Sequence, residues 1–233
     1  MTASFTPHTR PVTPPIGLLG GTFDPIHYGH LRLAEEMADA LGLARVRFLP
    51  SGTPPHRPAP AAPARARRDM VTLAIAGNPR FVLDEHEILQ TTPGYTVDTL
   101  TALRAELGAD TPLVLILGAD AFAGLEAWSR WRQLFELAHL AVAHRPGVAV
   151  AALEEALPAQ LRAEFDRRRA PVPDALAQTP AGRIWLHPMT ALDIAARHLR
   201  ERMAHGQSLR YLMPEVVIDY ILLHKLYRQE SNG

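Results

Sequence analysis

The chain has 233 residues, and its 24 Lys and Arg balance 24 Asp and Glu, so the net charge is zero with His neutral. This balance argues against a general polyanion binder such as a nucleic-acid-binding module, but it leaves room for a local anion pocket. Hydrophobic residues make up 47% of the chain and charged residues 21%, which is typical of a globular protein rather than a disordered one. The chain has no Cys, so disulfides, thiolate zinc sites and cysteine nucleophiles are excluded.

The first fifteen residues are polar and rich in Pro, and we expect them to form a disordered leader. They contain no apolar core of the kind that a secretory signal needs. The longest apolar runs, such as 216–223, are too short to span a membrane. We therefore expect a cytoplasmic protein with no membrane partner.

Short apolar runs and helical repeats alternate along the rest of the chain. The run 16–19 ends in Gly20-Gly21 and is typical of a buried parallel strand. Helical spacing follows from about Gly29 to Leu41, where Gly42 supplies a stop. The same reasoning predicts strands at 46–49, 81–83, 113–117, 139–143 and 184–186, and helices at 65–76, 96–107, near 120, 153–156, 161–169, 193–205 and 214–227.

This alternation predicts an α/β fold, namely a Rossmann-like doubly wound parallel sheet that is covered on both faces and followed by C-terminal helices. We expect a single domain over residues 16–233. The Ala-, Pro- and Arg-rich stretch 148–182 is interpreted as a variable insert within it.

The most informative segment reads GGTFDPIHYGH and runs from Gly20 to His30, between the first strand and the first helix. Ligands of open α/β sheets bind beyond the carboxyl ends of the strands. Gly20 and Gly21 allow a ligand to approach the backbone closely. His27 and His30 flank the helix start, where free N–H groups and the macrodipole favour anions. The segment therefore predicts a phosphate site.

Three other interpretations of this segment are weaker. It lacks the Gly-x-Gly-x-x-Gly spacing of a dinucleotide fingerprint, and no Gly-Lys-Ser/Thr follows as in a Walker loop. The pair His27 and His30 could suggest zinc, but Gly29 and the lack of a nearby third ligand argue against it, so no residue is assigned as a metal ligand.

The segment resembles the His-x-Gly-His signature of the nucleotidylyltransferase superfamily, and in its longer form it is similar to bacterial nicotinate-nucleotide adenylyltransferases. The resemblance implies transfer of AMP from ATP to nicotinate mononucleotide, with release of pyrophosphate and with Mg²⁺ as cofactor. It implies that His27 and His30 are catalytic. The ATP-binding residues that it implies in this segment are Gly20, Gly21, Thr22, Phe23, His27 and His30.

Two further strings resemble the acceptor side of that family. Residues 54–57, PPHR, are similar to its Pro-Pro-His-Lys loop, which implies that Arg57 is catalytic and binds the mononucleotide. Residues 93–100, PGYTVDTL, are similar to Pro-Ser-Tyr-Thr-x-Asp-Thr-Leu, which implies mononucleotide binding by Tyr95 and Thr96. Glu87 matches a family Glu, whereas Gln90 stands where the family usually has Arg.

The string Gly118-Ala-Asp120, followed by Trp128 and Trp131, resembles the family pattern Gly-x-Asp…Trp-x-x-Trp. It implies that Gly118 and Asp120 bind ATP and that Trp128 is a platform for the pyridine ring. We interpret Trp131 as a core residue. Arg145, after the fifth strand, is implied to bind ATP near the adenine.

The C-terminal motif departs from the family. Residues 192–200 read LDIAARHLR, where relatives usually carry two hydroxyl residues before the final Arg. Arg200 matches that Arg and is implied to be catalytic and to bind ATP phosphates. Ala195 and Arg197 replace the hydroxyl residues, and Arg197 either binds phosphate in a new way or faces solvent.

Two alternatives stay open at this point. One is a related nucleotidylyltransferase that uses nicotinamide mononucleotide or another phosphate acceptor. The other is a catalytically weakened nucleotide-binding homologue, for which the altered 195–200 segment is the only support. The sequence does not indicate the oligomeric state, and a homo-oligomer is compatible with it.

Overall fold

The computed structural model describes residues 13–52, 59–90, 94–144, 150–190 and 192–227. In these ranges six parallel strands form one sheet in the order β3-β2-β1-β4-β5-β6. This is the strand order of a doubly wound Rossmann-type fold, so the predicted fold class is confirmed. The strands are β1 (Ile16–Gly21), β2 (Arg45–Pro50), β3 (Phe81–Leu83), β4 (Leu113–Gly118), β5 (His139–His144) and β6 (Ile184–Pro188).

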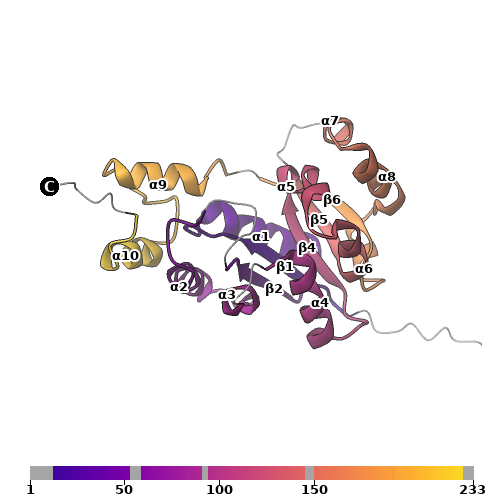
Figure 1. Ribbon diagram of the computed structural model, residues 1–233, viewed down its shortest axis with the longest axis horizontal. Helices are drawn as coiled ribbons and strands as arrows, with labels where there is room; N and C mark the ends of the chain where they lie inside the picture. The colour runs from indigo at the N-terminus through magenta and orange to yellow at the C-terminus, as the bar shows by residue number, and fades with distance from the viewer. Residues whose placement is uncertain (1–12, 53–58, 91–93, 145–149, 191, 228–233) are drawn as a thin grey trace, which may run out of the picture.

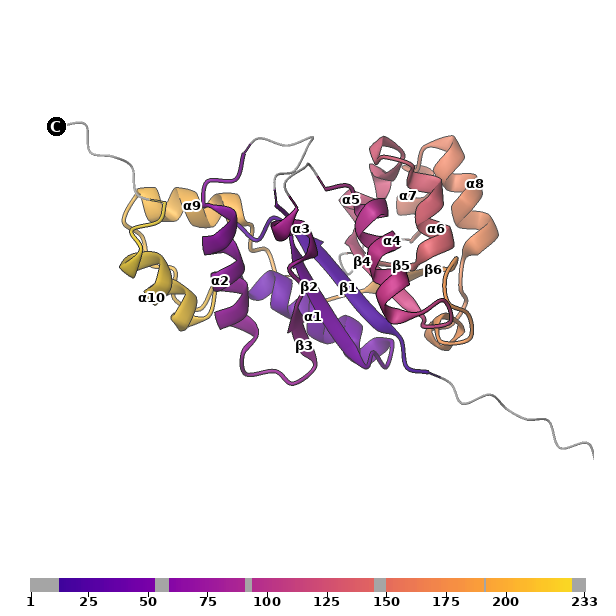
Figure 2. The same ribbon diagram turned by 60° about the horizontal axis from the view of Figure 1, so that its bottom comes forward.

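Helices cover both faces of this sheet, as Figures 1 and 2 show. In both views α9 and α10 lie beyond α2 at one end of the molecule, and α7 and α8 lie at the other end. The helices are α1 (Tyr28–Ala40), α2 (Ala64–Ile75), α3 (His86–Leu89), α4 (Thr96–Leu107), α5 (Ala119–Ala123), α6 (Leu134–Leu137), α7 (Val150–Glu155), α8 (Ala159–Arg168), α9 (Ala196–Ala204) and α10 (Glu215–Leu223).

The central strand β4 shows how the sheet divides the core in two. Val114 and Ile116 belong to a cluster with residues of α1, α2, α9 and α10. Leu113, Leu115 and Leu117 belong to a second cluster with residues of α4, α5, α6 and α8. Successive side chains of a strand point to opposite faces, so a continuous apolar strand supplies both cores.

The predicted elements are all present, with small differences at their ends. The four-residue helix α3 was not predicted, because a single turn shows no periodicity. Helix α9 begins at Ala196 rather than at 193. Helix α10 ends at Leu223 rather than at 227, and the residues that follow include Lys225 and Tyr227 with left-handed φ angles of 53° and 60°.

The stretch 148–182 contains the connection between β5 and β6. Parallel neighbours need a crossover of about a dozen residues or more, and α7 and α8 lie in this one. Leu161 and Phe165 of α8 are buried in the second cluster. This stretch therefore contributes to the core.

The leader expected at 1–15 lies almost wholly outside the described residues. No helix in the described ranges is long and apolar enough to cross a lipid bilayer.

Candidate active site

The strand order places two of the predicted site segments side by side. Strand β1 pairs with β2 on one side and with β4 on the other, so the strand order reverses between β1 and β4. Ligands of such sheets bind at the carboxyl ends of the strands at this point. Gly20 and Gly21 end β1, and Gly118 ends β4. A Cβ added at Gly20 or at Gly118 would meet nothing within 4 Å, so packing does not require either glycine.

The two histidines of the motif cap the start of α1. His27 is the N-cap residue, and its Nδ1 accepts a hydrogen bond from the Gly29 N–H at 3.1 Å. The Nδ1 of His30 in turn accepts from the His27 N–H at 3.3 Å. The two rings are stacked, with 3.8 Å between their centroids. The pair therefore forms a reciprocal capping box, in which imidazoles take the places usually held by Ser or Thr and Glu.

Gly29 makes this geometry possible. A Cβ at position 29 would lie 2.9 Å from Nδ1 of His27, which is closer than real Cβ atoms approach. Any side chain here would push the His27 ring out of its capping position. Steric hindrance by the His27 ring thus explains why glycine occupies this position of the His-x-Gly-His string.

Burial fixes the protonation of both rings. It lowers the pKa of His27 to about 4. Burial and the neighbouring His27 lower the pKa of His30 well below its usual value of 6.5. Because each Nδ1 accepts a backbone N–H, the single proton of each neutral ring sits on Nε2. At neutral pH the helix start therefore carries two neutral N–H donors beside the positive end of the helix dipole.

The C-terminal motif reaches the same helix start. Arg200 of α9 donates from Nη1 to the carbonyl oxygen of Asp24 at 2.6 Å, although 176 positions separate the two in sequence. The carbonyl oxygen of Ile194 lies 3.4 Å from where a Cβ on Gly29 would sit. The structure thus brings the Arg200 side chain against the β1–α1 loop, at Asp24, three positions before His27.

Arg197 faces solvent, which is one of the two orientations expected from the sequence. Its side chain is 74% exposed and pairs with Glu201 of the same helix at 3.7 Å. Ala195 is the N-cap residue of α9 and makes no side-chain hydrogen bond there. The departure from the family motif therefore removes a helix cap, and it places the added charge on the surface.

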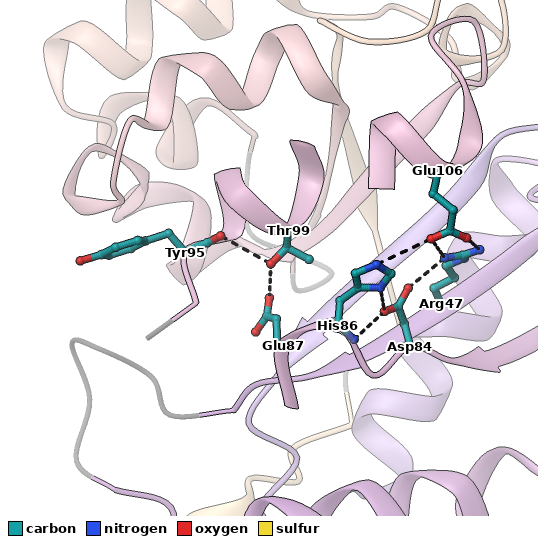
Figure 3. Close-up of polar contacts among 7 residues, drawn as sticks. All are labelled: Arg47, Asp84, His86, Glu87, Tyr95, Thr99 and Glu106. Atoms are coloured by element: carbon teal, nitrogen blue, oxygen red, sulfur yellow. Dashed lines mark hydrogen bonds and ion pairs between the residues drawn. The ribbon is translucent and has the colours of Figure 1, made fainter. Parts of the chain in front are cut away.

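The acceptor-side residues lie at the start of α4. Tyr95 is the N-cap residue and its side chain makes no capping hydrogen bond, and Thr96 is the first helical residue. Thr99, one turn later, donates to Glu87 at 3.1 Å (Figure 3). Glu87 is mostly buried, and burial raises its pKa.

A polar network holds this region against the sheet (Figure 3). Asp84, directly after β3, accepts from Arg47 of β2 at 3.0 Å and contacts Nδ1 of His86 at 2.7 Å. Arg47 also donates to Glu106 of α4 at 2.7 Å. The network therefore ties β2, α3 and α4 together, and with them the Tyr95 segment.

The other predicted site residues differ in accessibility. Asp120 is exposed in the first turn of α5, and Trp128 is half-buried against the second cluster. Trp131 is 8% exposed, which confirms it as a core residue. The ring of Phe23 is 1% exposed and packs edge-on against His30, so only its backbone can face a ligand. Arg57 and Arg145 lie outside the described residues.

Two residues that matter here were not assigned from the sequence. Asp24 is 5% exposed and accepts from the Ala61 N–H at 2.7 Å and from the Tyr227 hydroxyl at 2.8 Å. Arg67 of α2 is 1% exposed. It lies three and four positions before the buried Met70 and Val71, a spacing that could have placed it on the apolar face of the helix.

Comparisons with known proteins identify the relatives of this chain. The model of the cytidylyltransferase-like family matches residues 18–188. The probable nicotinate-nucleotide adenylyltransferase of Dechloromonas aromatica is 54% identical over 215 residues, which are 92% of this chain and 98% of that protein. That of Halorhodospira halophila is 52% identical over 202 residues, 87% of this chain and 90% of that protein.

Solved structures show the same fold at low identity. The nicotinic acid mononucleotide adenylyltransferase of Plasmodium falciparum in complex with NaAD has a TM-score of 0.67 and 16% identity, over 92% of this chain and 97% of that one. Its complex with APC gives a TM-score of 0.66 at 16% identity, over the same shares of both chains.

The fold and the histidine-capped helix thus define a nucleotidyltransferase of the cytidylyltransferase-like class. Within that class the chain belongs to the family of nicotinate-nucleotide adenylyltransferases. This confirms the adenylyltransferase function in NAD biosynthesis that the motifs predict, and it places the protein among enzymes that use ATP.

Proposed function

We propose that this chain transfers AMP from ATP to nicotinate mononucleotide, giving nicotinate adenine dinucleotide and pyrophosphate. The observation that carries the proposal is the start of α1, where two neutral imidazoles with Nε2 protons stand beside the reversal point of the sheet. High identity to named relatives over nearly the whole chain supports the choice of substrates.

The reaction needs no general base. A phosphate oxygen of the mononucleotide attacks the α-phosphorus of ATP and forms one P–O bond. The bond from that phosphorus to the oxygen bridging to the β-phosphate breaks, and its electron pair leaves with pyrophosphate. The attacking phosphate is already ionised, so catalysis consists of positioning and of stabilising the charge on phosphate oxygens.

We assign His27 and His30 to the triphosphate, where Nε2–H donors meet the charge that develops. Neutral donors suit this role, because they are fixed by the capping box before the substrate binds. Arg200, whose side chain is held against the Asp24 carbonyl, is assigned to the phosphates of ATP. Arg57 is assigned to the leaving pyrophosphate. Gly20, Gly21, Thr22, the backbone of Phe23, Gly118, Asp120 and Arg145 complete the proposed ATP site.

We assign the binding of the mononucleotide to Arg57 and to residues at the start of α4. Tyr95 and Thr96 are assigned to it, and Trp128 is assigned to stacking on the pyridine ring. The Thr99–Glu87 hydrogen bond would hold the start of α4 to α3, and the contacts of Asp84 with His86 and Arg47 would hold α3 to β2.

Mg²⁺ is proposed to arrive with ATP, since phosphate oxygens are ligands that it prefers. No group of three or more His, Asp or Glu side chains in the described ranges could hold a metal ion. We propose that the ion binds as part of the substrate, as the complex of Mg²⁺ with ATP.

We further propose that residues 16–233 act as one catalytic domain, that 148–182 is the part most open to variation, and that the protein works in the cytoplasm. The lack of Cys is compatible with a reducing compartment.

The deciding experiment measures pyrophosphate release by the purified protein with ATP and each of two acceptors. We expect nicotinate mononucleotide to give the higher kcat/KM. A preference for nicotinamide mononucleotide would transfer the assignment to that related activity. Tight ATP binding without pyrophosphate release for either acceptor would favour a weakened nucleotide-binding homologue.

A further inference from the structure

Arg67 connects three backbone segments, one of which leads into α1. Its Nη1 donates to the carbonyl oxygens of Thr22 at 2.7 Å and of Ser51 at 2.6 Å. Its Nη2 donates to the Gly52 carbonyl at 2.9 Å, and its Nε donates to the Ala62 carbonyl at 3.2 Å. One side chain thus joins the β1–α1 loop, the end of β2 and the turn before α2.

This arrangement uses properties that only arginine has. The guanidinium presents five N–H donors in a rigid plane, whereas a lysine ammonium is a compact charge that cannot reach four separate carbonyls. Burial lowers the pKa of Arg67, and the carbonyl oxygens together with the nearby Asp24 carboxylate compensate its charge. Removing the guanidinium would deprive one buried and three partly buried carbonyl oxygens of this donor.

The segments that Arg67 joins include the catalytic one. Thr22 lies five positions before His27, and the intervening Asp24 is itself tied to the turn before α2 through Ala61 and Ala62. The β1–α1 loop is therefore attached to α2 twice, once through the carboxylate of Asp24 and once through the guanidinium of Arg67. Both attachments lie in the five residues that precede His27.

We propose that Arg67 is a positioning residue for adenylyl transfer, which acts by holding the β1–α1 loop against the carboxyl end of β2. This inference rests on the proposed function for the reaction that it affects. A misplacement of about 1 Å in a catalytic group can reduce a rate by about 10²-fold. Arg67 therefore acts on kcat through His27 and His30 without touching the substrate.

The chain offers a matched control in Arg104 of α4. Arg104 also donates to several backbone carbonyls, and burial lowers its pKa too. Its acceptors are Gly108, Ala109, Thr111, Leu137 and Pro180, which precede β4, β5 and β6 at the opposite end of the sheet. Arg67 and Arg104 thus each bind several backbone carbonyl oxygens, but only Arg67 lies near the proposed site.

The test compares Arg67→Lys and Arg104→Lys in the full chain, at a temperature where circular dichroism shows both to be folded. We expect both to lower Tm, and only Arg67→Lys to lower kcat at saturating substrates, by about 10- to 100-fold. Hydrogen exchange without substrate gives a second readout: Arg67→Lys should speed exchange of amides in 22–24, while Arg104→Lys should not.

Three results would overturn the proposal. One is a folded Arg67→Lys protein with kcat within about twofold of the parent and unchanged exchange at 22–24. Another is an equal loss of kcat in Arg104→Lys. The third is a failure of both Arg67→Lys and Arg67→Gln to fold while Arg104→Lys folds, which would restrict Arg67 to stability. A parent protein that releases no pyrophosphate would contradict the proposed function instead, and the exchange measurement would still decide the role of Arg67.

Discussion

The two ends of the sheet use buried histidine in the same tautomer for different purposes. At the amino end, Nδ1 of His139 accepts the Arg183 N–H at 3.0 Å, and its Nε2 contacts the Thr179 carbonyl at 2.7 Å. At the carboxyl end, Nδ1 of His27 and of His30 likewise accept backbone N–H groups. Among the described residues, however, no carbonyl accepts from either Nε2.

Burial lowers the pKa of His139 and of His27 alike, each to about 4. The environment that makes a neutral imidazole is therefore common to both ends. What differs is whether the remaining N–H is bonded to another residue in the part of the chain that the structure describes. A fixed N–H donor that keeps its bonding capacity is what a phosphate site needs, and the comparison separates this property from burial itself.

The largest expected effect is on kcat. His30→Ala should lower kcat by at least about 10²-fold, the usual effect of losing one fixed donor to a developing charge. Loss of the capping contact to the His27 N–H should cost only about 1 kcal/mol of stability. Pyrophosphate release measures the first effect, and urea unfolding measures the second.

The control for this variant is His139→Ala. It should lower the free energy of unfolding more than His30→Ala does and leave kcat close to that of the parent. A near-normal kcat in His30→Ala would contradict the catalytic role proposed for His30 at the carboxyl end of the sheet.

Much of the architecture was predictable because its signals are local. Buried strands such as β4 are continuous apolar runs, and Gly118 and Gly108 mark boundaries next to them. The string from Gly20 to His30 contains both the glycines and the histidines of the phosphate site, so its chemistry could be inferred without knowing the strand order.

The contacts between distant segments were not predictable in this way. Arg200 meets Asp24 only because α9 folds back onto the β1–α1 loop. Arg67 lies between Arg65 and Arg68 in sequence, and composition alone does not show which of the three is buried. Helix α2 shows the same limit: Leu73 lies three positions after the buried Met70 but is 38% exposed, whereas Val71 and Ile75 are buried.

The next prediction concerns acid stability. A folded-state pKa below the unfolded value means that the unfolded chain binds more protons, so stability is complete above about pH 6.5 and is lost as pH falls toward 4. For His27 and for His139 the loss is on the order of 3 kcal/mol each, from 6.5 down to about 4 at about 1.4 kcal/mol per unit. Urea unfolding between pH 7 and 4 measures it.

The addition of ATP should change the pKa of the histidine at the carboxyl end of the sheet but not that of the histidine at the amino end. A bound phosphate favours the protonated imidazole, so ATP should raise the pKa of His27 in an NMR titration and leave that of His139 unchanged. Equal shifts at both histidines, or none at His27, would contradict a phosphate site confined to the carboxyl end.

A smaller effect is expected at the helix α9, which also lies at the carboxyl end but lacks a cap. Ala195→Ser supplies a hydroxyl at the N-cap position, where none now bonds to the helix. We expect a gain of about 1 kcal/mol in the free energy of unfolding. No gain from Ala195→Ser would show that the start of α9 is satisfied in another way.

The smallest effect is expected for Arg197, which tests how sharply the site ends along α9. Its side chain is 74% exposed, and its pair with Glu201 joins two exposed groups of one helix, a contact worth about 0–1 kcal/mol. Arg197→Ala should therefore leave kcat and the KM for ATP unchanged. Arg200→Ala, three positions later, should raise the KM for ATP, because the Arg200 side chain is held against the β1–α1 loop. If Arg197→Ala raised this KM as much as Arg200→Ala, the phosphate site would extend to the surface of α9, and the lost hydroxyls would have been replaced by a charge that binds substrate.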